Sequence, residues 1–201
     1  MMAETTDAAT QSTPNLLARL VTEASAPWLV NVLAALAVGS MSGAPAWGAF
    51  AAFIAGLGPI LGILMLMRLG RATDHHVGDR RHRGLVLGMI VIIMTLGVGL
   101  EVLWRAPAAI VTLSVAGLVT IVAVGVVTSI CRYKISVHTA VWAGTTLLLA
   151  ALIGTLWLLA ALALPLVGWA RVRVRDHTVG QTVTGALLGL ATVVATLGAL
   201  Q

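Results

Sequence analysis

Arginine and histidine side chains are concentrated in three short stretches of this 201-residue sequence. The stretches read RLGRATDHHVGDRRHR at 68–83, CRYKISV at 131–137 and RVRVRDHT at 171–178, and they hold ten of the twelve Lys and Arg residues. All five His residues lie in or beside them. A guanidinium fork matches phosphate oxygens, and an imidazole acts as nucleophile or general acid near neutral pH. Because the only acids there are Asp74, Asp79 and Asp176, the pattern favours phosphoryl chemistry without a metal over a magnesium site.

The segments that carry these stretches are strongly apolar. Hydrophobic residues make up 59% of the chain, charged residues 9%, and the mean hydropathy is +1.02. A soluble domain carries about a quarter charged residues, and a chain of this size cannot bury so much apolar surface in its own core. The composition therefore predicts an integral membrane protein. Because the apolar residues form long runs without alternation, the fold expected is an all-α, polytopic transmembrane helical bundle and not a barrel.

Seven apolar runs are candidates for membrane spans. About 20 helical residues cross the hydrocarbon layer, and Pro27, Pro45 and Pro107 stand where a helix start tolerates a missing N–H. The runs follow a polar N-terminal tail, 1–26, which is expected to be helical from Asn15 to Glu23, so the membrane domain is 27–201. One alternative joins the fifth and sixth runs across Gly154 into a single kinked helix. The seven runs are 27–42, 45–67, 84–103, 107–130, 138–153, 155–170 and 179–200.

The order of these runs predicts that the three polar stretches meet. Two spans separate each stretch from the next, so all three return to one face of the membrane, whereas the connections Gly43–Ala44 and Arg105–Ala106 lie on the other. Basic loops on one face are also what the positive-inside rule gives for any membrane protein, but that rule does not account for five histidines. The same rule predicts that the N-terminus and the polar face are cytoplasmic and the C-terminus is outside.

Spacing within the second and third stretches suggests specific contacts. If a helix starts near His177, then Gln181 lies one turn away on the same face. Its amide oxygen would accept from the Nδ1–H of His177 and leave Nε2 free as a nucleophile. Ser136 and His138 stand at another helix start, where unpaired N–H groups attract anions. Gly185 and Gly189, four residues apart, would let two helices approach closely.

These stretches resemble the motifs of the type-2 phosphatidic acid phosphatase superfamily, which also includes vanadium haloperoxidases. The family pattern is K-x6-R-P, then S-G-H, then S-R-x5-H-x3-D. Here the third motif reads Ala170-Arg171-x5-His177-x3-Gln181, the second Ser136-Val137-His138, and the first His76-x6-Arg83-Gly84. The segments YKISVHTAVWAG and PLVGWARVRVRDHTVGQTVTGALLG look like a divergent bacterial and archaeal branch, so a bacterial or archaeal cell membrane is expected. The resemblance covers about residues 68–189.

The resemblance implies a membrane-embedded, metal-independent lipid phosphatase with a six-helix phosphatase-like core plus one extra helix and no cofactor. His177 would form the phosphohistidine, and His138 would protonate the leaving oxygen and then activate water. Gln181 would orient the nucleophile. The implied phosphate-binding residues are Arg83, Lys134, Ser136, Arg171 and His76.

Three departures from the family pattern leave alternatives open. His76 stands in place of Lys, with Lys134 as a substitute charge, Val137 in place of Gly, and Gln181 in place of the Asp that stabilises the imidazolium. A neutral amide can fix the tautomer but stabilises positive charge less. The chain is therefore a slower phosphatase, or one aided by Asp176, or a non-catalytic protein that binds anionic lipid or a partner. Isoprenoid diphosphate, phosphatidic acid and phosphatidylglycerol phosphate all remain candidate substrates. A histidine-ligated metal site and an aspartate-rich prenyltransferase rank last, because neither paired helical ligands nor DxxxD occurs.

Overall fold

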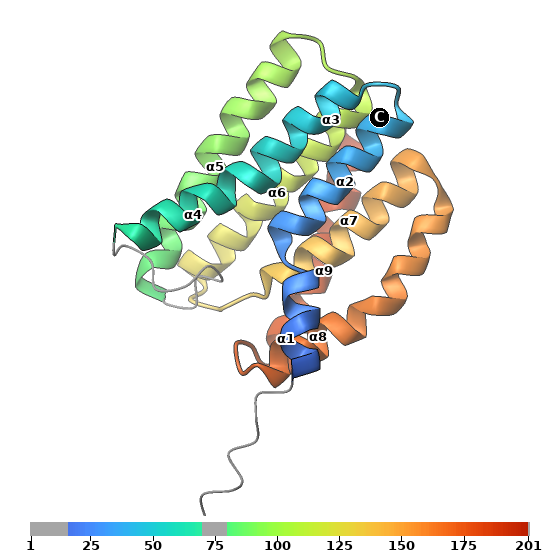
Figure 1. Ribbon diagram of the computed structural model, residues 1–201. Coiled ribbons are helices and arrows are strands. Elements are labelled where there is room, and N and C mark those ends of the chain that lie inside the picture. Colours follow the sequence, from blue (N-terminus) through green and yellow to red (C-terminus); the bar gives the residue numbers. More distant parts are fainter. Residues whose placement is uncertain (1–15, 70–79, 201) are drawn as a thin grey trace, which may run out of the picture.

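A computed structural model describes residues 16–69 and 80–200, with only the backbone given for residues 80–83. All regular structure in these ranges is helical (Figure 1). The elements, in chain order, are α1 Leu16–Ala24, α2 Pro27–Met41, α3 Pro45–Ala52, the π-helical segment η1 Phe53–Leu57, α4 Gly58–Arg68, α5 Arg80–Leu103, α6 Ala108–Ile130, α7 Val137–Ile153, the 3₁₀ segment η2 Thr155–Ala163, α8 Leu164–Arg173 and α9 Val179–Ala199.

The described helices support a membrane protein. Five continuous helical segments are long and apolar enough to cross a bilayer: 45–68, 84–103, 108–130, 155–173 and 179–199. The pair α1 and α2, bent by 43°, adds a sixth if it is counted as one span, and α7 is a shorter apolar helix of 17 residues. The helical bundle expected from the sequence is therefore confirmed. The helix expected at Asn15–Glu23 is confirmed as α1.

A π-helical segment, η1, interrupts the span of residues 45–68, which contains the apolar run 45–67 expected from the sequence. Pro59 has no N–H to donate to the carbonyl of Ala55, four residues earlier, and its ring crowds that turn. The wider turns of η1 accommodate the proline, and the Gly58 N–H bonds Phe53 O. Asn31 Nδ2 of α2 donates to Ala55 O at 2.8 Å. A side chain from a neighbouring helix thus satisfies a backbone carbonyl that has no water to bond in lipid.

A tight turn at Gly154 separates α7 from η2. Gly154 has φ 137°, and the chain after it runs back alongside α7 (Figure 1). Trp142 Nε1 donates to Ala160 O across this hairpin at 2.9 Å. The alternative of one long kinked helix is therefore wrong. In the nine-residue 3₁₀ segment, residues three apart eclipse, so Leu156, Leu159 and Leu162 form one exposed apolar row.

Helices α7 and α9 pack closely at Gly185 and Gly189, which confirms the close helix approach that these glycines predicted. A Cβ on Gly185 would lie 2.5 Å from Ser136 O, and one on Gly189 would collide with Ala140 O. Thr139 Oγ1 donates to Thr182 O at 2.8 Å across the same contact. Backbones can come this close only because neither glycine has a side chain.

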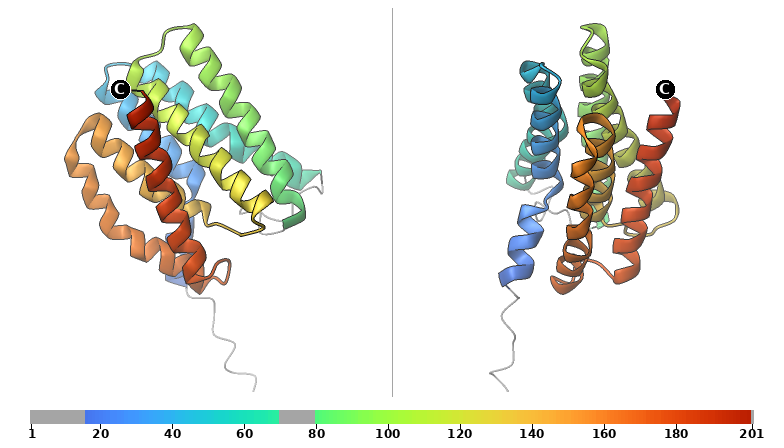
Figure 2. Two further views of the ribbon diagram at one scale, coloured as in Figure 1. Left: turned by 180° about the vertical axis from the view of Figure 1, so that it is seen from behind. Right: turned by 90° about the vertical axis from the view of Figure 1, so that its right-hand side faces the viewer.

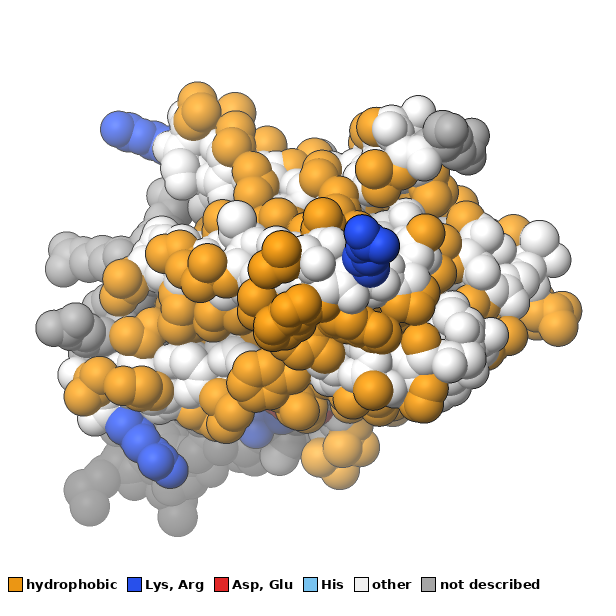
Figure 3. Space-filling model, turned by 90° about the horizontal axis from the view of Figure 1, so that it is seen from above, with side chains coloured by type: hydrophobic (Ala, Val, Ile, Leu, Met, Phe, Trp, Pro, Cys, Tyr) orange, Lys and Arg blue, Asp and Glu red, His pale blue; other side chains and the backbone are white. Residues whose placement is uncertain are grey.

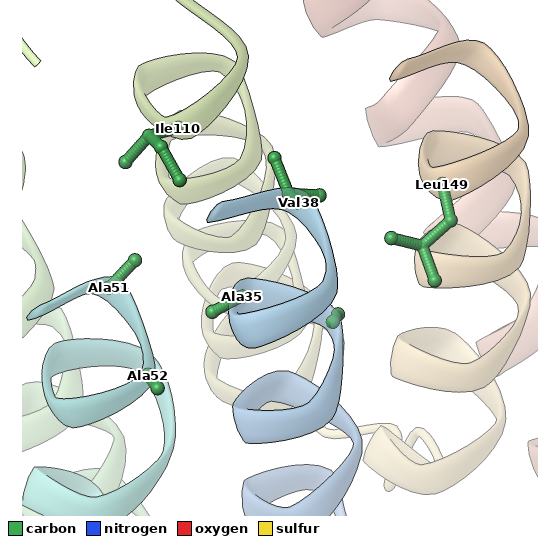
Figure 4. Close-up of a cluster of buried hydrophobic side chains, with 7 residues drawn as sticks. Ala35, Val38, Ala51, Ala52, Ile110 and Leu149 are labelled. Atoms are coloured by element: carbon green, nitrogen blue, oxygen red, sulfur yellow. The ribbon is translucent and has the colours of Figure 1, made fainter. Parts of the chain in front are cut away.

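The two ends of the bundle differ in composition. The start of α5, the 131–136 connection and the end of α8 lie at one end, and the C-terminus lies at the other (Figures 1 and 2). The second and third stretches and the described ends of the first thus lie at one end of the bundle, as counting spans predicted, whereas residues 70–79 lie outside the described residues. Figure 3 looks onto the C-terminal end, where hydrophobic and uncharged groups predominate. An apolar cluster of small residues beneath it joins α2, α3, α6 and α7 (Figure 4): Ala34, Ala35, Val38, Ala51, Ala52, Ile110 and Leu149.

Candidate functional site

One elongated cavity inside the bundle collects the polar residues of the second and third stretches. Lys134, His138, Arg171, Asp176 and His177 all line it, together with many apolar residues of α2, α4, α5, α6 and α7. Its volume is about 170 Å³, many times the ~10–15 Å³ that one water needs on the same measure. The cavity is therefore amphipathic, with ionisable groups at the loop end and hydrocarbon side chains along the helices.

The end of α8 places Arg171 and Asp176 together. The N–H of Asp176 bonds Arg171 O at 3.2 Å, and the N–H of Arg175 bonds Val172 O at 3.0 Å. This is a Schellman motif, with Arg175 at φ 62° in the left-handed position that glycine usually takes. The turn brings Asp176 Oδ2 to 2.7 Å from Arg171 Nη2. Arg171 is only 2% exposed, so its charge is neutralised by a neighbour five residues along the chain.

The start of α9 fixes His177 and Gln181. His177 Nδ1 lies 3.2 Å from Gln181 Oε1, which is the contact the four-residue spacing predicted. Since an amide oxygen only accepts, this contact places a proton on Nδ1. Gln181 Oε1 also accepts from Thr178 N at 3.2 Å, and Thr178 Oγ1 accepts from Gln181 N at 3.3 Å. These two bonds form a capping box that begins the helix. Gln181 thus has two roles: it caps the start of α9 and it contacts His177.

The start of α7 brings the second stretch against the third. Lys134 Nζ donates to Asp176 O at 2.9 Å, and Ser136 N donates to Gln181 O at 3.2 Å. Ser136 is the N-cap residue of α7, and its hydroxyl accepts from Thr139 N at 3.5 Å. These bonds tie together loops that are more than forty residues apart in the sequence.

The structure brings together some of the residues expected in the site and not others. Lys134, His138, Arg171 and His177 line one cavity, and Gln181 contacts His177. Ser136 is fully buried at the α7 cap and is absent from the cavity lining. Arg83 lies in the first turn of α5, where only the backbone is described, and His76 lies outside the described residues. The first motif therefore has no described geometry.

Two features of the site, the capping box of α9 and the position of Asn31 in the cavity lining, have recognisable patterns in the sequence. Thr178-x-x-Gln181 before an apolar run is a capping-box pattern, and it accounts for Gln181 on structural grounds. Intramembrane Asn31 also lines the cavity beside Trp28, and polar residues in apolar helices commonly face the interior. The Arg171–Asp176 pair had no such signal, because a five-residue separation is not a helical contact spacing.

The chemistry available at this end is anion binding combined with proton transfer. Two cations and two imidazoles line one cavity among apolar side chains, where charge interactions are stronger than in bulk solvent. Among the described residues, no group of three His, Cys, Asp or Glu side chains is close enough to hold a metal ion.

Comparison with protein-family models, with curated proteins and with solved structures finds no match to this chain.

Proposed function

We propose that this protein is a membrane-embedded, metal-independent lipid phosphatase that hydrolyses a phosphate or diphosphate monoester of a lipid or isoprenoid. The observation that carries the proposal is the cavity, which joins Lys134, His138, Arg171 and His177 to a long apolar interior. A phosphorylated lipid has the same division between a charged head and an apolar chain. The resemblance of the second and third motifs to the type-2 phosphatidic acid phosphatase superfamily supports the same activity.

The proposed reaction uses His177 as the nucleophile. Its Nε2 attacks phosphorus, a P–N bond forms, and the bond from phosphorus to the leaving oxygen breaks. His138 gives that oxygen a proton. It then takes a proton from water as the water attacks phosphorus, the P–N bond breaks, and His177 and phosphate are released. Lys134 and Arg171 bind the phosphate oxygens and stabilise the charge that develops on them. The amide of Gln181 keeps the proton on Nδ1.

The contact between Arg171 and Asp176 must change for this reaction. Asp176 Oδ2 occupies one side of the guanidinium, where phosphate would bind. The carboxylate is about a third exposed, so it can move toward solvent at modest cost. A phosphate with two negative charges then replaces a carboxylate with one.

A second candidate is a non-catalytic protein of the same fold that binds anionic lipid or a partner. The capping box favours it, because Gln181 is explained by the helix start alone. The Arg171–Asp176 pair favours it too, since a buried arginine that is already neutralised needs no phosphate.

Phosphate release separates the two candidates. Purified protein in detergent with EDTA is incubated with isoprenoid diphosphate, phosphatidic acid and phosphatidylglycerol phosphate. A phosphatase releases phosphate from at least one, forms an acid-labile phosphoenzyme, and loses both in His177→Ala. Val179→Ala, at an exposed position two residues away, is the matched control and retains activity. Absence of release from every substrate, or more than a few per cent of activity in His177→Ala, rejects the mechanism.

We also propose seven spans and a cytoplasmic site. In this topology, the bent pair α1–α2 and the shorter α7 each count as a span, so the N-terminus and the polar end share one side and the C-terminus faces the other. Single cysteines in the tail and after Leu200, in a Cys131→Ser background, test it in intact cells. A membrane-impermeant thiol reagent should label the C-terminal cysteine alone. Labelling of the tail cysteine rejects the cytoplasmic assignment.

A further inference from the structure

The apolar part of the cavity is an internal channel that follows α6 away from the polar end. The α6 residues that line it extend from Val124 through Gly117 to Leu113. Eleven residues of helix rise about 16 Å. Val124 packs with Ala140 near the start of α7, and Ala116, next to Gly117, packs with Leu148 two turns higher. The channel thus extends from the level of His138 along about half of α6.

The channel is lined by side chains from several helices. Lining residues come from α2, α3, α4, α5, α6 and α7, with Val193 of α9, so an inserted chain would contact protein along its length.

Gly117 and Met94 lie side by side in the far part of the channel. Both line the cavity, and a Cβ added to Gly117 would lie 3.0 Å from Met94 Cε. Beyond them Ser114 Oγ donates to Glu101 Oε1 at 2.9 Å, and both residues are fully buried. A polar pair at this depth is a poor neighbour for the end of a hydrocarbon chain.

From these contacts we infer that the cavity binds one hydrocarbon chain of a single-chain lipid phosphate, with Gly117 and Met94 setting the longest chain that fits. This inference rests on the proposed function for the phosphate end only, and it does not require hydrolysis. Phosphatidic acid, with two chains, would place one chain outside the channel and bind more weakly.

The test is a binding profile over chain length. Protein in lipid nanodiscs, with His177→Ala to prevent turnover, is titrated with n-alkyl phosphates of increasing length, and thermal stabilisation is measured. Affinity should rise with each added methylene and then stop rising at a limit. Gly117→Leu should lower that limit by several carbons. Gly117→Ala, whose added methyl only displaces the flexible end of Met94, should shift it less and guards against misfolding of the larger variant.

Gly125→Leu is the matched control, because Gly125 lies on the same helix, is absent from the cavity lining, and has no atom within 4 Å of an added Cβ. Its profile should equal that of the parent. A limit that is the same in folded Gly117 variants overturns the inference, and so does equal or tighter binding of phosphatidic acid. A shifted limit, together with no phosphate release by the protein that retains His177, would reject the phosphatase proposal and support the chain-binding channel. Phosphate release together with a binding profile that has no chain-length limit would support the phosphatase proposal and reject the chain-binding channel.

Discussion

Two helix ends in this molecule have the same backbone structure and opposite chemistry. The helix α5 ends as α8 does, since Ala106 N bonds Glu101 O at 2.7 Å and Arg105 N bonds Val102 O at 3.1 Å. Arg105, at φ 55°, takes the left-handed position that Arg175 takes in α8. At both ends, the carbonyl that accepts from the N–H five residues later belongs to a buried ionisable residue: Glu101 in α5 and Arg171 in α8.

The difference lies in what surrounds each buried group. Glu101 is fully buried and accepts from the Ser114 hydroxyl, and it is not among the residues that line the cavity. Arg171 lines the cavity, contacts a carboxylate, and has a lysine and two histidines in the same lining. A Schellman turn can bury an ionisable residue at either end of the bundle, but only at the α8 end do Lys134, His138 and His177 line the same cavity as that residue.

Replacing the buried ionisable residue should therefore lower phosphate release at the α8 end, but not at the α5 end. We expect Arg171→Met to lower phosphate release about 10²–10³-fold, the usual effect of losing one group that stabilises the transition state. Glu101→Gln keeps an acceptor for Ser114 and should leave release within about threefold, as a change at a distant site does. Melting temperatures of both variants show whether the fold is intact. Equal losses of activity in two folded variants would contradict the distinction drawn between the ends.

The contact between Gln181 and His177 sharpens the account of the α8 end. Gln181→Ala removes the acceptor of Nδ1 and one half of the capping box, so we expect at least about a tenfold loss of phosphate release and a loss of about 1 kcal/mol of stability. Gln181→Asp restores a charged partner for the imidazolium and should retain or raise activity. Steady-state kinetics and thermal unfolding of both variants test this. Complete inactivity of folded Gln181→Asp would show that the neutral amide is required.

Replacing the side chain that contacts each buried group, Asp176 for Arg171 and Ser114 for Glu101, should give a smaller difference, seen in phosphate affinity. Asp176→Asn releases Arg171 from a contact worth about 1 kcal/mol at this exposure, so we expect inorganic phosphate to bind about fivefold more tightly. Ser114→Ala should leave phosphate affinity unchanged. Phosphate binding is measured by calorimetry in detergent. If Asp176→Asn instead lowers kcat strongly, Asp176 takes part in catalysis as the charged partner that Gln181 does not provide.

Replacing the left-handed arginine at the end of α5 or of α8 should give the smallest effects of all, and the two effects should be equal. A side chain in this conformation costs about 1–2 kcal/mol, and glycine avoids that cost but is more flexible when unfolded. We therefore expect Arg105→Gly and Arg175→Gly each to stabilise the protein by about 0.5 kcal/mol. Neither arginine lines the cavity, so activity should be unchanged. Thermal unfolding checks both, and a clear destabilisation by either variant would show that the arginine makes a compensating contact.

The amino-acid sequence by itself determined the features that depend on neighbours along the chain. Apolar runs defined the helices because a backbone in lipid must bond within its own segment. Prolines stand at the starts of α2 and α3 and cap α6. The His177–Gln181 contact followed from a four-residue spacing, and the convergence of the polar stretches followed from counting spans. Gly185 and Gly189 indicated a close helix pair without indicating its partner.

The tertiary structure decided which distant groups meet, because no periodicity in the sequence encodes contacts between separate helices. Asn31 bonds a carbonyl 24 residues away, which makes Pro59 tolerable in a membrane helix. Lys134 reaches the backbone of Asp176 across 42 residues, and Ser136 serves as a helix cap because its hydroxyl is enclosed there. The cavity itself depends on side chains from at least five helices, and its shape is fixed only when those helices pack together.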